Sequence, residues 1–127
     1  MIIPSLEKRS CSRFTINNAR VCFKKAGIFS FLRFFSKSYC LVNISKAGLS
    51  FNYKKKMKRG AKIILKLYIP KMKPLYLIGR VRWQKKICGS LHVNIGVEFV
   101  PFADRIGHNK LDALAKLKNL EALYSKK

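Results

Sequence analysis

Two short polar motifs in the first half of the chain carry residue types suited to holding a planar, anionic ligand. The first is Arg9-x-x-x-Arg13, and the second, Asn43-x-Ser45-x-x-Gly48, begins thirty residues after Arg13. A guanidinium presents its N–H donors as a rigid fork that fits two phosphate oxygens or the O6/N7 edge of guanine. Two such forks on one flexible segment can close over a ligand. Solvated surface arginines are the competing interpretation in a chain this basic.

The second motif falls on a predicted turn between two β segments. Strand alternation places Asn43 and Ser45 on the same side of the backbone. The Asn43 amide offers an acceptor and two donors to a base edge, and the Ser45 hydroxyl can hydrogen-bond a phosphate or a base nitrogen. We expect Gly48 to permit a positive φ and a close approach of the backbone. An ordinary β-hairpin turn, in which all three residue types are common, is the alternative.

The elements that must position these motifs are mostly β segments. After an irregular arm over residues 1–12, Phe14, Ile16, Val21 and Phe23 sit at alternate positions, with Asn17-Asn18 as a turn or bulge between them. Further strands are predicted over residues 39–44, 48–53, 62–69, 75–86 and 91–100, with Ile78, Val81 and Trp83 as core candidates of the long strand. Strands this short, in a chain this small, favour a closed or nearly closed barrel.

The C-terminal segment has a different periodicity. Leucines recur at every third position from Leu111 to Leu123, with alanines between them, which is typical of an amphipathic helix. We expect Asn109 to be the N-cap and Asp112 to lie in the first turn. Such a helix would cover one opening or face of the barrel, and binding of a partner is the alternative. The arm, residues 1–12, and one barrel-and-helix domain, residues 13–127, then account for the chain.

Charge and composition limit the kinds of partner. The chain has 127 residues, about one domain, with 28 basic and 5 acidic residues and a formal charge of +23. This balance favours a nucleotide, a nucleic acid or an acidic lipid, although many of the lysines are expected to be solvated surface residues. The apolar run around residues 27–35 is interrupted and too short to span a bilayer, and the N-terminus lacks a signal-peptide pattern, so we expect a cytoplasmic protein without a transmembrane segment.

Catalysis and metal binding are not favoured by the polar residues. The five acidic residues are scattered, so no carboxylate pair suits acid–base chemistry, and we expect a binding protein rather than an enzyme. The four cysteines, Cys11, Cys22, Cys40 and Cys88, lack the spacing of a metal site, and buried or incidental thiols are the expectation. Neither a metal nor a cofactor is predicted.

Taken together, the two motifs resemble the signatures of the PilZ domain. Lys8-Arg9-Ser-Cys-Ser-Arg13-Phe14 is similar to the Arg-x-x-x-Arg arm of that family, and Asn43 to Gly48 is similar to its Asp/Asn-x-Ser-x-x-Gly turn. The segments Gly79-Arg-Val-Arg-Trp83 and Ile95-Gly-Val-Glu-Phe99 are similar to its later strands. The resemblance covers roughly residues 7–123 and implies a six-stranded antiparallel β-barrel followed by a helix. It also implies binding of cyclic di-GMP.

The resemblance assigns a role to each motif residue. Arg9 and Arg13 would clamp guanine edges and phosphates from the arm. Asn43 would read a guanine, Ser45 would hydrogen-bond the ligand, and Gly48 would let the backbone close in. Asn43 stands where the family more often has Asp, and a neutral amide in place of a charged acceptor weakens the guanine contact.

Two further residues are secondary candidates. Lys8 precedes the first arginine, at a position where the family varies and where ligand stoichiometry can be tuned. Trp83 lies where an aromatic ring could flank the ligand, and packing in the barrel core is the alternative for that residue.

The leading hypothesis is therefore a cyclic di-GMP receptor whose arm folds over the ligand and creates a surface for a protein effector. The alternative is a basic barrel that binds nucleic acid, with Tyr53, Tyr68 or Tyr76 stacking on a single strand. The sequence leaves open the downstream process, the ligand stoichiometry, the oligomeric state and whether the positive charge serves a second polyanion.

Overall fold

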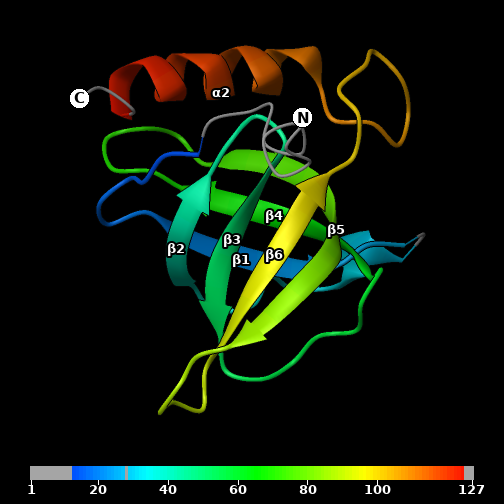
Figure 1. The fold of residues 1–127 in the computed structure, drawn as a ribbon. Helices are drawn as coiled ribbons and strands as arrows, with labels where there is room; N and C mark the ends of the chain where they lie inside the picture. Colours follow the sequence, from blue (N-terminus) through cyan, green and yellow to red (C-terminus); the bar gives the residue numbers. More distant parts are fainter. Residues whose placement is uncertain (1–12, 28, 125–127) are drawn as a thin grey trace, which may run out of the picture.

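Six antiparallel strands close into a barrel, and one helix lies across one end of it (Figure 1). The structure is a computed structural model that describes residues 13–27 and 29–124. The strands are β1 (Arg20–Lys25), β2 (Tyr39–Ile44), β3 (Gly48–Tyr53), β4 (Lys62–Tyr68), β5 (Leu75–Lys86) and β6 (Val93–Phe99); a single 3₁₀ turn, η1, spans Ser30–Leu32 and the helix α2 spans Leu111–Tyr124. Around the barrel the order is β1-β2-β3-β6-β5-β4. The predicted antiparallel barrel with a C-terminal helix is confirmed.

Alternation along the strands builds the core. In β4, Ile63, Leu65 and Leu67 are buried while their neighbours in sequence are less buried or exposed. The same alternation buries one face of β3 and of β6: Leu49, Phe51, Tyr53, Val93, Ile95, Val97 and Phe99 are all buried. Because every strand has two neighbours, each one forms hydrogen bonds along both edges, and the barrel leaves no open sheet edge among the described strands.

The first predicted segment is shorter than expected. Only Arg20–Lys25 forms a strand, whereas Phe14 makes a single antiparallel bridge with Ile44. The predicted interruption at Asn17-Asn18 is confirmed as a turn, in which Asn18 has a φ of 66°. Asparagine tolerates this left-handed conformation better than most residues.

The helix α2 packs on the barrel through a narrower face than the leucine row suggests. Ala113, Leu117 and Leu120 are buried in the same core cluster as the strands. Leu111 and Leu123, at the ends of the row, are instead 53% and 66% exposed. A residue advances about 100° around a helix, so positions spaced by three drift by roughly 60° at each step and only the middle of the row faces the barrel.

The predicted N-cap is wrong. Asn109 is only 3% exposed, and its side chain bonds to the barrel rather than to the first turn of α2. Its Oδ1 accepts the Ile78 N–H at 2.6 Å, and its Nδ2 donates to the carbonyls of Ile78 and Val100, both at 3.0 Å. The side chain therefore satisfies buried backbone groups between β5 and the segment that leads to α2.

Within the described residues, no helix has the length and apolar character needed to cross a bilayer.

Candidate functional site

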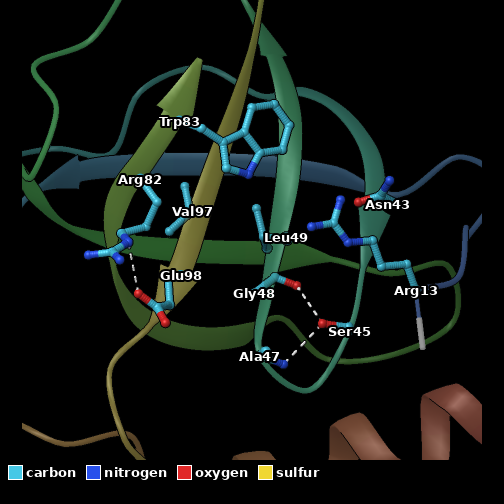
Figure 2. A pocket seen from close by; sticks show the side chains of 10 residues that line it. All are labelled: Arg13, Asn43, Ser45, Ala47, Gly48, Leu49, Arg82, Trp83, Val97 and Glu98. Carbon is cyan, nitrogen blue, oxygen red and sulfur yellow. Dashed lines mark hydrogen bonds and ion pairs between the residues drawn. The ribbon is translucent and has the colours of Figure 1, made fainter. Parts of the chain in front are cut away.

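A backbone bridge brings the two polar motifs together. Phe14 and Ile44 exchange N–H···O=C bonds, both of 2.9 Å, and their side chains are 5% and 0% exposed. Phe14 directly follows Arg13, and Ile44 lies between Asn43 and Ser45. The bridge therefore fixes Arg13 against the second motif, and Figure 2 shows the Arg13 guanidinium next to Asn43.

The β2–β3 hairpin is held by Ser45. Its N–H donates to the Gly48 carbonyl at 2.8 Å, and its hydroxyl accepts the Ala47 N–H at 3.0 Å and makes a long contact of 3.5 Å to the same Gly48 oxygen. Ser45 is 5% exposed. Its hydroxyl shapes the turn that carries Ala47 and Gly48, so its effect on a ligand would be largely indirect.

A glycine is required at position 48 because no side chain would fit there, and not because of its backbone conformation. Its φ is not positive, so the expected left-handed bend is wrong. A Cβ at this position would overlap the Val97 carbonyl oxygen and lie 3.2 Å from the Glu98 Cα. The close backbone approach that we expected is made to strand β6, and a side chain here would force the two strands apart.

Asn43 is oriented by a buried serine. An irregularity in the register between Leu41 and Asn43 places Asn43 opposite Ser50. The Ser50 hydroxyl, 1% exposed, donates to Asn43 Oδ1 at 3.0 Å. This bond holds the amide plane fixed and leaves its NH₂ group to other partners.

Trp83 is not a core residue, and that prediction is wrong. The register of β5 against β6 slips between Val81 and Trp83, so two residues of β5 oppose one of β6. Such a bulge re-aims side chains, and Arg82 and Trp83 are consequently both exposed, Trp83 by 37%. The indole lies over Gly96, where a Cβ would overlap its Cε2, Nε1 and Cδ2 atoms.

These residues surround one pocket of about 320 Å³ on the outside of the barrel (Figure 2). Its lining consists of Arg13, Asn43, Ser45, Ala47, Gly48, Leu49, Arg82, Trp83, Val97 and Glu98. In the view of Figure 2, Arg13 and Asn43 lie on one side, Arg82 and Glu98 lie on the other, and the Trp83 ring forms one end. The structure thus brings together Arg13, Asn43, Ser45, Gly48 and Trp83; Arg9 and Lys8 lie outside the described residues.

Two charged residues of the pocket were not predicted. Arg82 Nε lies 3.0 Å from Glu98 Oε1, with both side chains more than half exposed. Both residues belong to segments that resemble later PilZ strands, but only the strand register shows that they face the pocket. The lining therefore contains two guanidinium groups and one carboxylate, which favours an anionic ligand. Hydrogen-bond donors, an exposed aromatic face and cationic groups equip this pocket for binding a base and a phosphate.

The three described thiols do not line this pocket. Cys22 is buried, and desolvation raises the pKa of its thiol. Cys40 and Cys88 are exposed, and Cys11 lies outside the described residues. Across residues 13–27 and 29–124, no three His, Cys, Asp or Glu side chains gather as a metal site would require.

The structure is a six-stranded barrel whose outer face carries a cationic pocket between Arg13, the β2–β3 hairpin and the later strands β5 and β6. The model of the PilZ domain family matches residues 7–116, and the chain belongs to that family. PilZ domains are binding and adaptor domains rather than enzymes, and cyclic di-GMP is the ligand of the family. Comparison with curated proteins found no match.

The fold is also similar to a solved structure, the Bacillus subtilis Inhibitor of motility (MotI/DgrA). The TM-score is 0.64 at 16% sequence identity, over 91% of this chain and 50% of that one. The chain spans about half the length of that protein. At this identity the likeness is one of fold.

The nucleic-acid alternative gains no support from these comparisons. One of its three candidate stacking residues, Tyr53, is only 9% exposed and packs edge-on against Phe23 and Tyr39. Tyr68 and Tyr76 are 38% and 53% exposed.

Proposed function

We propose that the chain is a cyclic di-GMP receptor that binds the dinucleotide in the outer-face pocket. The observation that carries this proposal is the Phe14–Ile44 bridge, because it brings Arg13 of the first family motif beside the second motif in one cationic pocket with an aromatic wall. The pocket volume of about 320 Å³ lies at the lower end of the range for small-ligand sites, about 300–1,000 Å³. A ligand larger than this would extend over the rim toward the arm.

Each group has a defined task in this proposal. The Arg13 guanidinium binds a phosphate or the O6/N7 edge of a guanine. The Asn43 amide, oriented by Ser50, reads a guanine edge, and the exposed Trp83 ring stacks on a base. Arg9 approaches from the arm and supplies a second guanidinium. The ordered arm then presents a surface to a protein effector.

Calorimetric titration of the purified chain with cyclic di-GMP tests the site. Arg13→Ala should abolish measurable binding while the thermal unfolding transition is retained, because Arg13 is exposed and holds no core contact. Arg105→Ala is the matched control, since it removes the same charge from an exposed loop away from the pocket. Equal affinities of the wild type and Arg13→Ala would refute the proposed site.

The arm is tested separately by limited trypsin digestion. Cleavage after Lys8 and Arg9 should become slower when cyclic di-GMP is added, and GMP at the same concentration should have a much smaller effect. Arg9→Ala should weaken binding without changing the stability of the barrel. A cleavage rate that ligand leaves unchanged would remove the arm from the mechanism, even if the pocket binds.

A further inference from the structure

A second surface of the chain carries exposed apolar side chains in one loop. The aromatic loop, defined here as residues 26, 27 and 29–38, connects β1 to β2. Phe29, Phe31, Leu32 and Phe34 are 59%, 74%, 66% and 95% exposed. Single exposed apolar residues are ordinary on protein surfaces, but four within six residues mark an interaction site.

The aromatic loop is held in shape while it exposes these side chains. Ser36 N–H donates to the Phe23 carbonyl at 2.8 Å, and Phe23 N–H donates to Ser36 Oγ at 3.0 Å. The 3₁₀ turn η1 adds bonds from Leu32 N–H to Phe29 and from Arg33 N–H to Ser30, each of 3.0 Å. A loop already ordered loses less entropy when it binds.

Phe35 differs from its neighbours because it packs against the barrel. Its ring lies 6.0 Å from that of Tyr76, and the ammonium groups of Lys24 and Lys66 lie 4.7 and 5.6 Å from its centre. Hydrogen bonding with Tyr68 and Tyr76 raises the pKa of Lys66, whose side chain, like that of an ordinary lysine, is a cation at neutral pH. Phe35 thus anchors the loop, and the apolar residues before it face outward.

Positively charged side chains lie within the aromatic loop and next to it. Lys25 and Arg33 are exposed within or next to the aromatic loop. Ala26 N–H bonds to the Lys62 carbonyl at 3.0 Å, which brings the loop to the barrel end where the basic run 54–59 enters β4. Glu7 and Glu98 are consecutive acidic residues in the sequence, so the intervening ninety positions carry no negative side chain.

The aromatic loop and the pocket lie on different parts of the barrel. The loop packs on β1, β4 and the start of β5, whereas the pocket lies over the β2–β3 hairpin, β6 and the far part of β5. Tyr76 and Trp83 are seven residues apart on β5, about 23 Å along the strand. Figure 1 shows the loop, drawn in blue to cyan, extending from the side of the barrel. Both surfaces can therefore be occupied together.

We propose that the aromatic loop binds the surface of an anionic lipid bilayer. Phe31 and Phe34 enter the boundary between headgroups and acyl chains, and the surrounding lysines and arginines contact acidic headgroups. A bilayer fits better than a protein groove, because the apolar residues lie on a projecting loop that has cations within it and at its base. Lysines and arginines near an anionic leaflet add to the binding of the apolar rings, so the charge and the aromatic residues act together.

Partition of the full chain into vesicles tests this proposal. Phosphatidylcholine vesicles with about one third phosphatidylserine are compared with pure phosphatidylcholine at about 0.15 M salt. Wild type should partition strongly only into the anionic vesicles. The double variant Phe31→Ser, Phe34→Ser should partition about tenfold or more weakly, because two apolar rings no longer enter the interface.

The matched control is Leu91→Ser, Ile106→Ser. These side chains are 85% and 102% exposed and lie outside the aromatic loop, so the control should partition as the wild type does. Arg13→Ala should also partition as the wild type does, which separates this proposal from cyclic di-GMP binding.

Equal partition of wild type and the Phe31/Phe34 variant would overturn insertion of the rings. Absence of wild-type partition would overturn the proposal and point to a protein as the partner of the loop.

A second measurement covers the case in which the double variant misfolds. Phe34→Trp places an indole at a position that is 95% exposed, and Trp83, the single tryptophan of the wild type, provides the baseline emission. Anionic vesicles should shift the emission of Phe34→Trp to the blue well beyond the shift of the wild type. Identical spectra with and without vesicles would contradict insertion of the loop.

Discussion

Single residues set the electrostatic balance of the pocket. Arg13 and Arg82 attract an anionic ligand, whereas Glu98 repels it and also pairs with Arg82 at 3.0 Å. The pair is exposed, so it contributes little to the stability of the fold. If the pocket binds cyclic di-GMP as proposed, the main effect of the pair is on the ligand, because the pair determines how much of the Arg82 charge is free to bind.

We predict that Glu98→Gln strengthens cyclic di-GMP binding by about threefold, within the range of an exposed ion pair, about 0.2–1 kcal/mol. The change removes a negative charge and releases the Arg82 guanidinium. Asp112→Asn is the matched control, since Asp112 pairs with Lys116 at 3.3 Å on the helix and makes the same change in net charge. Calorimetry that finds equal gains for both variants would show a general charge effect.

The side chain of Asn43 provides a second test of how one residue affects ligand binding. We predict that Asn43→Asp tightens binding by about fivefold, because charge-assisted hydrogen bonds to the guanine N–H groups are stronger than those of an amide. The Ser50 hydroxyl can still donate to the carboxylate, so the orientation of the side chain is kept. Weaker binding by this variant would mean that the Asn43 NH₂ group donates to the O6/N7 edge instead.

A glycine controls the position of the indole. Gly96→Ala should displace the Trp83 ring, since the new Cβ would occupy the place of its Cε2, Nε1 and Cδ2 atoms. We expect a red shift of the Trp83 emission and weaker cyclic di-GMP binding. Gly89→Ala is the control: its φ of 75° strains an alanine, but nothing lies within 4 Å of the added carbon. It should lower stability and leave the emission unchanged.

At the scale of elements, the decisive contact is the bridge between Phe14, which precedes β1, and Ile44 of β2. Phe14→Leu should loosen the Phe14–Ile44 bridge and weaken ligand binding several-fold, at a cost of about 1 kcal/mol in unfolding free energy. Ile16→Val is a matched control, because Ile16 is equally buried, at 4%, but lies beyond the bridge. Denaturant unfolding should find similar losses for both, and calorimetry should find weaker binding only for Phe14→Leu. Equal affinities would contradict the role of the bridge.

Sequence periodicity predicted most of these elements and less of the site. Strand alternation identifies the core of β3, β4 and β6 because one face of each strand is buried. The motif residues Arg13, Asn43, Ser45 and Gly48 line one pocket, as a ligand site would require. Their contact depends on a single bridge between residues thirty apart, and no local pattern encodes that pairing.

The errors arise where long-range contacts override local patterns. Trp83 fits the alternation of β5 until the bulge turns it outward, and a bulge is defined only by the register of two strands. Asn109 has the sequence context of an N-cap, but its amide instead bonds to Ile78 of β5 and to Val100, which follows β6. Both partners lie outside the first turn of α2. In both cases the residue type indicated a structural or functional role, but only the tertiary structure determined which groups the side chain contacts.

At the scale of the whole molecule, a chain with a net charge of +23 attracts polyanions in general, and binding in the pocket must be distinguished from that attraction. General attraction of polyanions is sequence-independent and decreases steeply with salt, because counterions are released on binding. A pocket that adds stacking and hydrogen bonds to a few charge contacts depends less on salt. The two modes of binding can therefore be separated by ionic strength.

Thermal unfolding of the whole chain makes this separation measurable. Cyclic di-GMP at about 100 times its Kd should stabilise the native state by about 2.7 kcal/mol and raise Tm by several degrees. Most of this rise should persist at about 0.5 M salt, whereas any rise caused by an arbitrary single-stranded oligonucleotide should disappear there. Arg13→Ala should abolish the response to cyclic di-GMP and leave the response to the oligonucleotide nearly unchanged, because the variant removes one charge of many. If both ligands lose their effect in parallel as salt increases, the pocket adds no specificity and the nucleic-acid alternative becomes the better account of the charge.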